Sequence, residues 1–436
     1  MRICLFEDRR AADLAPLTLT RPAFDLLCGL TPLADKPAHY FAPDAIGYLV
    51  RPLVADLVCE SHPHAPVNDP LWLRAGPTVL VNARWIPPAR PTDQPAPKTR
   101  DLFADGPFLA VCDGELAFAA VGPELLAGVS PSAVDDCLED WLTALPRQEV
   151  GGAVVRRPWD LVNRNGNQII DDFPWATDAE TAGCRPLDVA LVGPADRLVL
   201  DPSARLDPMV AIDTTAGPVV IAADAVVGAL SHLIGPCTIG PGTHVLGARV
   251  RPGTSLGPHC RVGGEVEASI VQGYSNKAHD GFLGHSFVGE WVNLAAGTHT
   301  GDLRNDYGTV SVPADGVSLN TGRVKVGSFV GDHARTGLGV LLNCGSVVGA
   351  FASVLPTGQL APRDVPSFAR YGPDGFAEDL DLVARFAVAD TMMRRRGRSL
   401  SRAQDAVYRA VAAQTAAHRR RALGGGVEPP RQRRAL

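Results

Sequence analysis

The hydrophobic pattern of the chain changes at about residue 186. Before that point, short apolar runs alternate with helix-like and Pro-rich pieces, and each run has the length of a buried strand in an α/β sheet. These runs predict strands at 3–6, 45–50, 78–81 and 108–112. Between 130 and 145, apolar residues at helical spacing predict an amphipathic helix. Residues 1–185 are therefore expected to fold as one mixed α/β domain.

Beyond residue 186, aliphatic residues recur six positions apart, with phase slips between successive groups. The groups are Leu200, Leu206 and Ile212; Ile221 and Val227; Ile239 and Val245; Leu256 and Val262; and Val288 and Leu294. This period does not match an α-helix and is typical of a parallel β-helix, whose triangular coils bury their apolar sides against one another. Gly and Pro residues one or two positions later suit the corners. Residues 186–365 are expected to form this stack.

The six-residue repeat pauses between residues 300 and 323, which predicts a loop that leaves the stack at one corner. It is expected to resume at Val326, Asp332, Leu338 and Cys344. Binding groups commonly lie on loops that a rigid scaffold positions, so residues 302–307 are candidates for such groups.

A helical extension is expected over residues 366–436. Helices are predicted at 375–396 and 401–423, and Ser401 is the expected N-cap of the second. Three consecutive glycines at 424–426 predict that the tail beyond them is disordered.

Composition and charge narrow the classes of function. The 436 residues exceed what one compact core usually serves, and the net charge of −6 provides no broad basic face for nucleic acid. Basic pieces at 394–396 and 419–421 are compatible with anion binding, but we interpret them as solvated helix ends. No apolar run approaches the ~20 residues that span a bilayer, and the first residues turn acidic too soon for a signal peptide. We therefore expect a cytoplasmic protein without a membrane or nucleic-acid partner.

One histidine in the repeat region has a position suited to proton transfer. His279 precedes a Leu-Gly pair, and Asn293 and the backbone at 295–297 follow about one coil later. Acyl transfer from a thioester to an amine needs a base for the amine proton and donors for the developing oxyanion. An imidazole, whose unperturbed pKa is ~6.5, suits the first role. From the spacing alone, a surface histidine at a coil corner is an equally good interpretation.

Residues 277–284 read Lys-Ala-His-Asp-Gly-Phe-Leu-Gly, and residues 289–298 read Gly-Glu-Trp-Val-Asn-Leu-Ala-Ala-Gly-Thr. This motif resembles the acetyltransferase half of the bifunctional enzyme that acetylates glucosamine-1-phosphate and then uridylylates it. The resemblance implies a left-handed coil, acetyl-coenzyme A as cosubstrate, and a homotrimer with the acyl site between adjacent prisms. It implies His279 as the catalytic residue; Asn293, Asn305, Tyr307 and Lys277 as substrate-binding residues; and Ala296 and Gly297 as cofactor contacts. Three features depart from the family. Its Asn-Tyr-Asp-Gly motif reads Asn-Asp-Tyr-Gly here, at residues 305–308. Phe282 replaces a usual tyrosine, and the lysine that holds the sugar phosphate has no clear counterpart.

Residues 16–22, Pro-Leu-Thr-Leu-Thr-Arg-Pro, resemble a branch of the sugar nucleotidyltransferases, as do segments 81–84 and 158–163. The resemblance implies a Rossmann-like nucleotidyltransferase domain that binds a nucleoside triphosphate with Mg²⁺. It implies Arg9, Arg21 and Thr18 as nucleotide-binding residues, with Lys36 as a further positive charge. Mg²⁺ would need one or two oxygen ligands, for which Asp113, after the strand at 108–112, is a candidate, and Asp8 and Asp160 are others. The Gly-rich turn of the family is missing after the first strand, and Ala23 stands where its lysine is usual.

The two resemblances together imply a bifunctional transferase. It would acetylate glucosamine-1-phosphate and then join the product to UTP or another nucleoside triphosphate, making UDP-N-acetylglucosamine or a related nucleotide sugar. One alternative is an acyltransferase whose degenerate first domain only binds nucleotide or sugar, which the missing Gly-rich turn favours. Another is a non-catalytic regulatory or scaffold protein, against which the joint retention of His279 and Asn293 argues.

Overall fold

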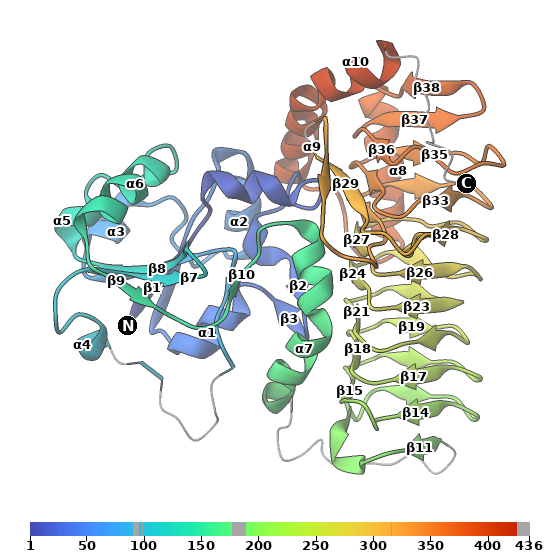
Figure 1. The fold of residues 1–436 in the computed structure, drawn as a ribbon, viewed down its shortest axis with the longest axis horizontal. Coiled ribbons are helices and arrows are strands. Elements are labelled where there is room, and N and C mark those ends of the chain that lie inside the picture. The colour runs from blue at the N-terminus through green and yellow to red at the C-terminus, as the bar shows by residue number, and fades with distance from the viewer. Residues whose placement is uncertain (90–95, 98, 177–188, 315, 425–436) are drawn as a thin grey trace.

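The computed structural model describes residues 1–89, 96–97, 99–176, 189–314 and 316–424. A first domain lies beside a tall parallel β-solenoid, and the last helices of the chain pack against one end of that solenoid (Figure 1). None of the described helices is long and apolar enough to cross a membrane. The predicted disordered tail lies outside the described residues.

The first domain is built on a six-stranded sheet with the order β4-β1-β5-β8-β7-β9. Its strands are β1 (Arg2–Phe6), β4 (Ala45–Leu49), β5 (Thr78–Asn82), β7 (Phe108–Cys112), β8 (Glu115–Val121) and β9 (Arg147–Glu149). β1 runs parallel to β4 and β5, whereas β8 is antiparallel to β5 and β7. The four predicted strands are confirmed, and so is the predicted helix, which is α6 (Val134–Ala144).

Both faces of this sheet are buried, which explains why its strands are continuous apolar runs. Alternate residues of β1 enter two separate cores: Ile3 and Leu5 join one, Cys4 and Phe6 the other. The second core is covered by α6. The first is covered by α7 (Pro158–Ala176), which lies between the sheet and the solenoid (Figure 1). The other helices are α1 (Asp35–Phe41), α2 (Ala55–Ser61), α3 (Pro70–Arg74), α4 (Thr99–Leu102) and α5 (Pro123–Leu126).

The solenoid has about ten turns between residues 190 and 371, and each turn contributes a strand to each of three faces. Face A, toward the first domain, holds β12 (Leu198–Leu200), β15 (Val219–Ile221), β18 (Cys237–Ile239), β21 (Thr254–Leu256), β24 (Ile270–Gly273), β27 (Phe287–Glu290), β31 (Phe329–Val330), β34 (Val347–Val348) and β36 (Asp364–Val365). Face B holds β13 (Arg205–Leu206), β16 (Val226–Val227), β19 (His244–Val245), β22 (Arg261–Val262), β25 (Asn276–Lys277), β32 (Arg335–Thr336), β35 (Ser353–Val354), β37 (Ala369–Gly372) and β38 (Gly375–Glu378). Face C holds β11 (Ala190–Val192), β14 (Ala211–Asp213), β17 (His232–Ile234), β20 (Arg249–Val250), β23 (Glu265–Glu267), β26 (Phe282–Gly284), β28 (His299–Thr300) and β33 (Leu341–Leu342).

The predicted interior positions up to residue 294 are buried inside the prism, except for the partly exposed Leu206. After the interruption, the predicted phase is wrong. Leu338 is 70% exposed at a corner, and Asp332 makes an ion pair outside the prism. The interior positions there are Val330, Leu342, Val348 and Val354. A corner leucine and an interior leucine look the same in sequence, and only the strand register separates them.

Residues 301–328 leave the stack between β28 on face C and β31 on face A, as the pause in the repeat predicts. This excursion contains a hairpin of β29 (Ser311–Ala314) and β30 (Val317–Asn320). Its Val310 and Val312 are buried in the same core as first-domain residues. The excursion therefore helps to fix the first domain against face A.

The chain ends in α8 (Leu382–Arg394), α9 (Arg402–Gln414) and α10 (Ala416–Gly424). Ser401 caps α9 through a capping box with Gln404, as predicted. Two predictions were wrong: residues 375–378 form β38 rather than helix, and the second predicted helix breaks at Thr415.

A column of stacked rings follows the corner between faces A and B. It consists of Tyr274, Trp291, His333, Phe351 and Phe368. Each ring comes from one coil, at a left-handed φ between 53° and 59°. This conformation is unfavourable for bulky residues, and the stacking and burial of the rings offset its cost. Phe386 of α8 and Tyr408 of α9 pack on this column, so it anchors the C-terminal helices.

Candidate functional site

His279 lies outside the prism, at the corner where face B turns into face C. β25 ends at Lys277 and β26 begins at Phe282, and the histidine between them is exposed to solvent. Gly281 completes the turn at φ 142°, and a side chain there would collide with the carbonyl oxygen of Thr298. The corner therefore presents the imidazole on a backbone that the next coil holds in place.

Lys277 lies inside the prism, unlike the substrate-binding residue that the resemblance implies. It pairs with Val262 of the preceding coil and shares that residue's interior position. Its Nζ donates hydrogen bonds to the carbonyl oxygens of Gly263 at 2.8 Å and His279 at 3.0 Å. Burial lowers the pKa of this ammonium to about 8, and Asp280 opposes that shift. Its observed contacts brace the backbone at His279.

The backbone amides of Ala296 and Gly297, in the coil above His279, differ in their contacts. The Gly297 N–H donates to the carbonyl oxygen of Asp280 at 2.9 Å, so this amide is occupied. The carbonyl oxygen of Ala296 accepts from Gly339 at 2.8 Å, whereas the Ala296 N–H has no partner within the described ranges. Of the two predicted cofactor contacts, Ala296 alone can direct its amide to a ligand at this corner.

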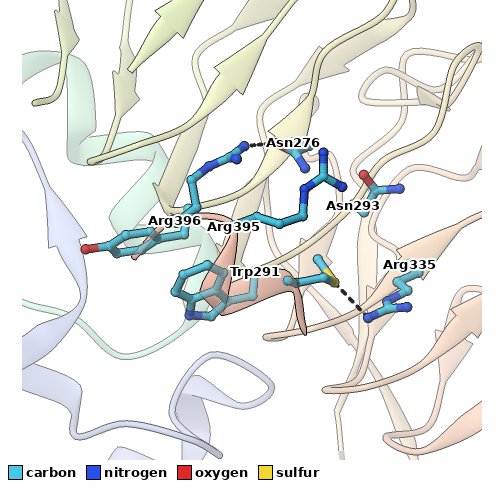
Figure 2. Close-up of a pocket in the computed structure, with 8 residues that line it drawn as sticks. Asn276, Trp291, Asn293, Arg335, Arg395 and Arg396 are labelled. Atoms are coloured by element: carbon cyan, nitrogen blue, oxygen red, sulfur yellow. Dashed lines mark hydrogen bonds between the residues drawn. The ribbon is translucent and has the colours of Figure 1, made fainter. Parts of the chain in front are cut away.

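Asn293 lines a cavity of about 240 Å³ between face B and the end of α8 (Figure 2). It lies directly above Asn276 in the next coil. The cavity is lined by Tyr274, Asn276, Trp291, Asn293, Arg335, Met392, Arg395 and Arg396. The structure therefore places the predicted substrate-binding Asn293 beside a cluster of arginines that sequence reasoning had interpreted as solvated.

Asn305 lines a second, wider groove of about 560 Å³ on face C. Phe282, three residues after His279, also lines it, together with His299 and Arg304. Tyr307 stands on the same excursion and is 73% exposed. The predicted substrate residues thus divide between two faces, and His279 occupies the corner that both faces share.

Sequence reasoning missed a histidine–carboxylate pair at the corner between faces C and A. The Nδ1 atom of His285 lies 2.7 Å from Oδ2 of Asp302, and both side chains are largely buried. Such a pair orients an imidazole for proton transfer. The sequence contained a pattern that could have revealed this pair: His285 follows His279 by one six-residue repeat, and Asp302 begins the predicted loop segment. His285 is therefore a rival to His279 as a base.

The predicted nucleotide-binding side chains of the first domain are engaged in structural contacts. Arg21 bridges Asp332 at 2.5 Å and Glu290 at 3.1 Å, both in the solenoid, so it joins the two domains. Thr18 is buried and donates through Oγ1 to the carbonyl oxygen of Ala11 at 2.8 Å. These contacts replace the phosphate contacts that the resemblance implies for Arg21 and Thr18.

The other predicted positive charges are paired as well. Lys36 is buried in an ion pair with Asp172 at 2.5 Å. Arg9 is exposed on the first domain and pairs with Glu139 at 2.7 Å. Of the predicted nucleotide-binding cations, only Arg9 remains on the surface.

The carboxyl ends of the parallel strands, where ligands of α/β sheets bind, carry charges that neutralise one another. After β1, Asp8 accepts hydrogen bonds from the buried Arg84, at 3.0 Å from Nε and 2.5 Å from Nη2. Asp113 is exposed in the turn between β7 and β8. Within the described ranges no group of three His, Cys, Asp or Glu side chains is placed to hold a metal ion. Because one or two carboxylates together with substrate phosphates are enough to hold Mg²⁺, Asp113 stays a predicted metal ligand.

Comparison with known proteins confirms the resemblance. Residues 3–181 match the family described as "Sugar nucleotidyl transferase". The chain is 37% identical over 118 residues to a protein of Sulfurisphaera tokodaii named "Bifunctional sugar-1-phosphate nucleotidylyltransferase/acetyltransferase", over 27% of this chain and 29% of that protein. It is 30% identical over 196 residues to "Bifunctional protein GlmU" of Corynebacterium efficiens, over 43% of this chain and 35% of that protein. The chain thus spans about a third of the length of these relatives, and it is homologous to transferases.

Proposed function

We propose that this chain, whose residues 3–181 match the sugar nucleotidyl transferase family, transfers an acetyl group from acetyl-coenzyme A to the amine of an amino-sugar phosphate at the His279 corner. The observation that carries the proposal is the exposed His279 on the outside of the prism, one coil below the Ala296 amide, which bonds to no described residue. A base and an oxyanion donor are the two groups that such a transfer needs.

The reaction at this corner follows from those two groups. The imidazole of His279 takes a proton from the amine, and the amine nitrogen attacks the thioester carbonyl carbon. The Ala296 N–H donates to the oxyanion that forms. When the carbon–sulfur bond breaks, the imidazolium returns its proton to the leaving thiolate, which yields the amide and the free coenzyme A thiol. Lys277 holds the His279 carbonyl from inside the prism, so the base keeps its position during the cycle.

The face C groove is the proposed place of the acceptor sugar. It extends from Phe282, next to the corner, to Asn305 on the excursion, and it is mostly apolar with a few polar groups, as small-molecule sites are. A sugar in this groove can present its amine to the exposed side of His279.

A homotrimer is the proposed assembly. Exposed aliphatic side chains recur along the corner between faces B and C, both below and above His279: Met209, Leu230, Leu246, Leu338 and Leu355. Repeated exposed aliphatics on one edge are typical of an interface. A second prism packed on this edge would close His279 into a cleft that excludes water.

The second proposed activity is nucleotidyl transfer in the first domain, which would join the acetylated sugar phosphate to UTP with release of pyrophosphate. The match of residues 3–181 to the family supports it. The paired state of Arg21, Lys36 and Arg84 instead favours the alternative, an acyltransferase whose first domain only binds a nucleotide or sugar.

Two assays on the full chain separate these possibilities. The first follows free thiol from acetyl-coenzyme A in the presence of glucosamine-1-phosphate, and we expect acceptor-dependent release. The second follows pyrophosphate from UTP and N-acetylglucosamine-1-phosphate. Thiol release without pyrophosphate release would identify the acyltransferase alone, and the absence of both would refute the proposed function.

A further inference from the structure

We infer that the cavity between face B and the end of α8 binds a phosphoryl group, the anionic end of a substrate or cosubstrate. The identity of that molecule rests on the proposed function, but the binding of phosphate does not. The cavity lies on a different face from the face C groove.

Three guanidinium groups converge on this cavity without a counterion. Arg335 comes from β32, whereas Arg395 and Arg396 follow α8 directly. In the part of the chain that the structure describes, none of the three forms an ion pair with a carboxylate. By contrast, the buried cations at the domain interface are paired, as Arg21 is with two carboxylates. An anion from solution is the missing partner.

The contacts that these arginines do make leave much of their donor capacity unused. Nη2 of Arg335 meets only the sulfur of Met392, at 2.8 Å, and a thioether is a weak acceptor. Nη2 of Arg396 donates to Oδ1 of Asn276 at 3.1 Å, which is the one acceptor oxygen among these contacts. The Nε of Arg396 is buried and has no hydrogen-bond partner among the residues that the structure describes. A buried donor without an acceptor is costly, and a phosphoryl oxygen would supply one.

The field around the cavity is positive. Burial lowers the pKa of Arg335, and the charge of Arg385 adds to this effect. Burial also lowers the pKa of Arg261, with a contribution from Arg396. The pKa of His259 is lowered by burial and by the charges of three arginines, among them Arg396. Burial is the larger cause in each case, and the charge of Arg396 adds to it at both Arg261 and His259. A bound dianion would offset this charge.

The arginines are directed at the cavity and not at the end of their own helix. Figure 2 shows the Arg395 and Arg396 side chains extending across the cavity toward Asn293 and Asn276. The planar fork of a guanidinium matches the oxygens of a phosphoryl group, and an asparagine amide adds a neutral donor. The interpretation of residues 394–396 as a solvated helix end therefore fails for Arg396, which is half-buried and bonded to Asn276, whereas Arg395 lines the cavity from an exposed position.

The size and position of the cavity define the ligand class. Its volume of about 240 Å³ is below the ~300–1,000 Å³ of sites that enclose a whole drug-sized ligand, so it suits a phosphoryl end while the remainder of the molecule extends outward. Asn276 precedes His279 by three residues, which is roughly 10 Å of extended chain. A ligand anchored here by its phosphate can reach the corner of face B.

Calorimetric titration of the full chain tests the inference, with inorganic phosphate as the first probe. We expect wild-type protein to bind phosphate, and Arg335→Gln and Arg396→Gln to weaken binding at least tenfold. Arg394→Gln is the matched control: this residue lies in α8, is exposed, and pairs with Asp390. Its affinity is expected to stay within twofold of wild type. Thermal melts without phosphate check folding, and neither cavity variant should melt lower, because each removes an unpaired charge.

Titrations with coenzyme A, glucosamine-1-phosphate and UTP then identify the source of the phosphoryl group as the ligand whose affinity falls in the same two variants. Wild-type protein that binds none of the four probes, or cavity variants that bind all of them as wild type does, would overturn the inference. His279→Ala keeps this outcome separate from the proposed function, since it should abolish acyl transfer and leave phosphate binding intact.

Discussion

At the scale of single residues, the location of a charged side chain in the fold decides its role. Lys277 belongs to the motif that carries the resemblance, yet its ammonium is inside the prism and bonds to backbone carbonyls. Arg21 belongs to the first-domain motif, yet it connects that domain to Asp332 of the solenoid. The sequence motifs single out such residues, but they cannot distinguish a side chain that stabilises the fold from one that binds a ligand. Both roles use the same hydrogen bonds and ion pairs. His279 was predictable, since the repeat places it at a corner outside the prism.

Asp25 provides a residue-scale prediction about pH. Burial raises the pKa of this carboxyl to about 7, Arg21 lowers it, and Glu290, Glu7 and Asp35 raise it further. Between pH ~4 and ~7 the folded chain therefore holds a proton that the unfolded chain has released, so the free energy of unfolding falls as pH rises through this window. Asp25→Asn removes the titration. We expect its stability advantage over wild type to grow from pH 4.5 to 7.5, by about 1–3 kcal/mol, and then to level off.

Denaturant unfolding at a series of pH values measures this advantage for the two proteins side by side. A difference between them that does not change with pH would show that Asp25 is ionised throughout in the folded state.

At the scale of elements, the strands of the first domain and the coils before residue 294 follow from periodicity, because burial on a fixed face imposes a fixed spacing. The positions that face the interior after the excursion cannot be derived from periodicity, because the sequence does not show how many residues the excursion adds to the repeat. Residues 375–378 were assigned to a helix because a short edge strand has no periodicity of its own. The ring column was not foreseen either, because its successive members are 17 to 42 residues apart in sequence and meet only when the coils stack.

At the scale of the whole molecule, three parts are joined so that both proposed sites lie on one stack, the acyl-transfer site at a corner and the phosphate cavity on face B. The first domain is held against face A by Arg21 and by the excursion, and α8 and α9 are held by the ring column. The first domain and the arginine cavity thus occupy two faces of the prism, and the third face, C, retains its groove. The sequence predicts this order of parts, but not which face each part covers, because a covering contact depends on residues far apart in the chain.

The exposed edge between faces B and C gives a prediction for the assembly. If three copies meet there, light scattering of the wild-type chain will give about 138 kDa, three times the 46.0 kDa of one chain. Leu338→Glu places a charge on an apolar side chain that is 70% exposed in one copy, so it should yield monomers without loss of helix or strand signal. Leu71→Glu is a control, since Leu71 is 76% exposed on the first domain. A Leu338→Glu protein of unchanged mass would exclude this edge as the interface.

The most direct test of the central claim compares acyl transfer by wild type, His279→Ala and His285→Ala under the same conditions. If the exposed corner histidine is the base, His279→Ala will lower the rate of thiol release by about 10²–10⁴, as loss of a general base does. The His285→Ala protein will then lose less than about tenfold, because its partner Asp302 lies at the opposite edge of face C. Full activity in His279→Ala, or a larger loss in His285→Ala, would contradict the account.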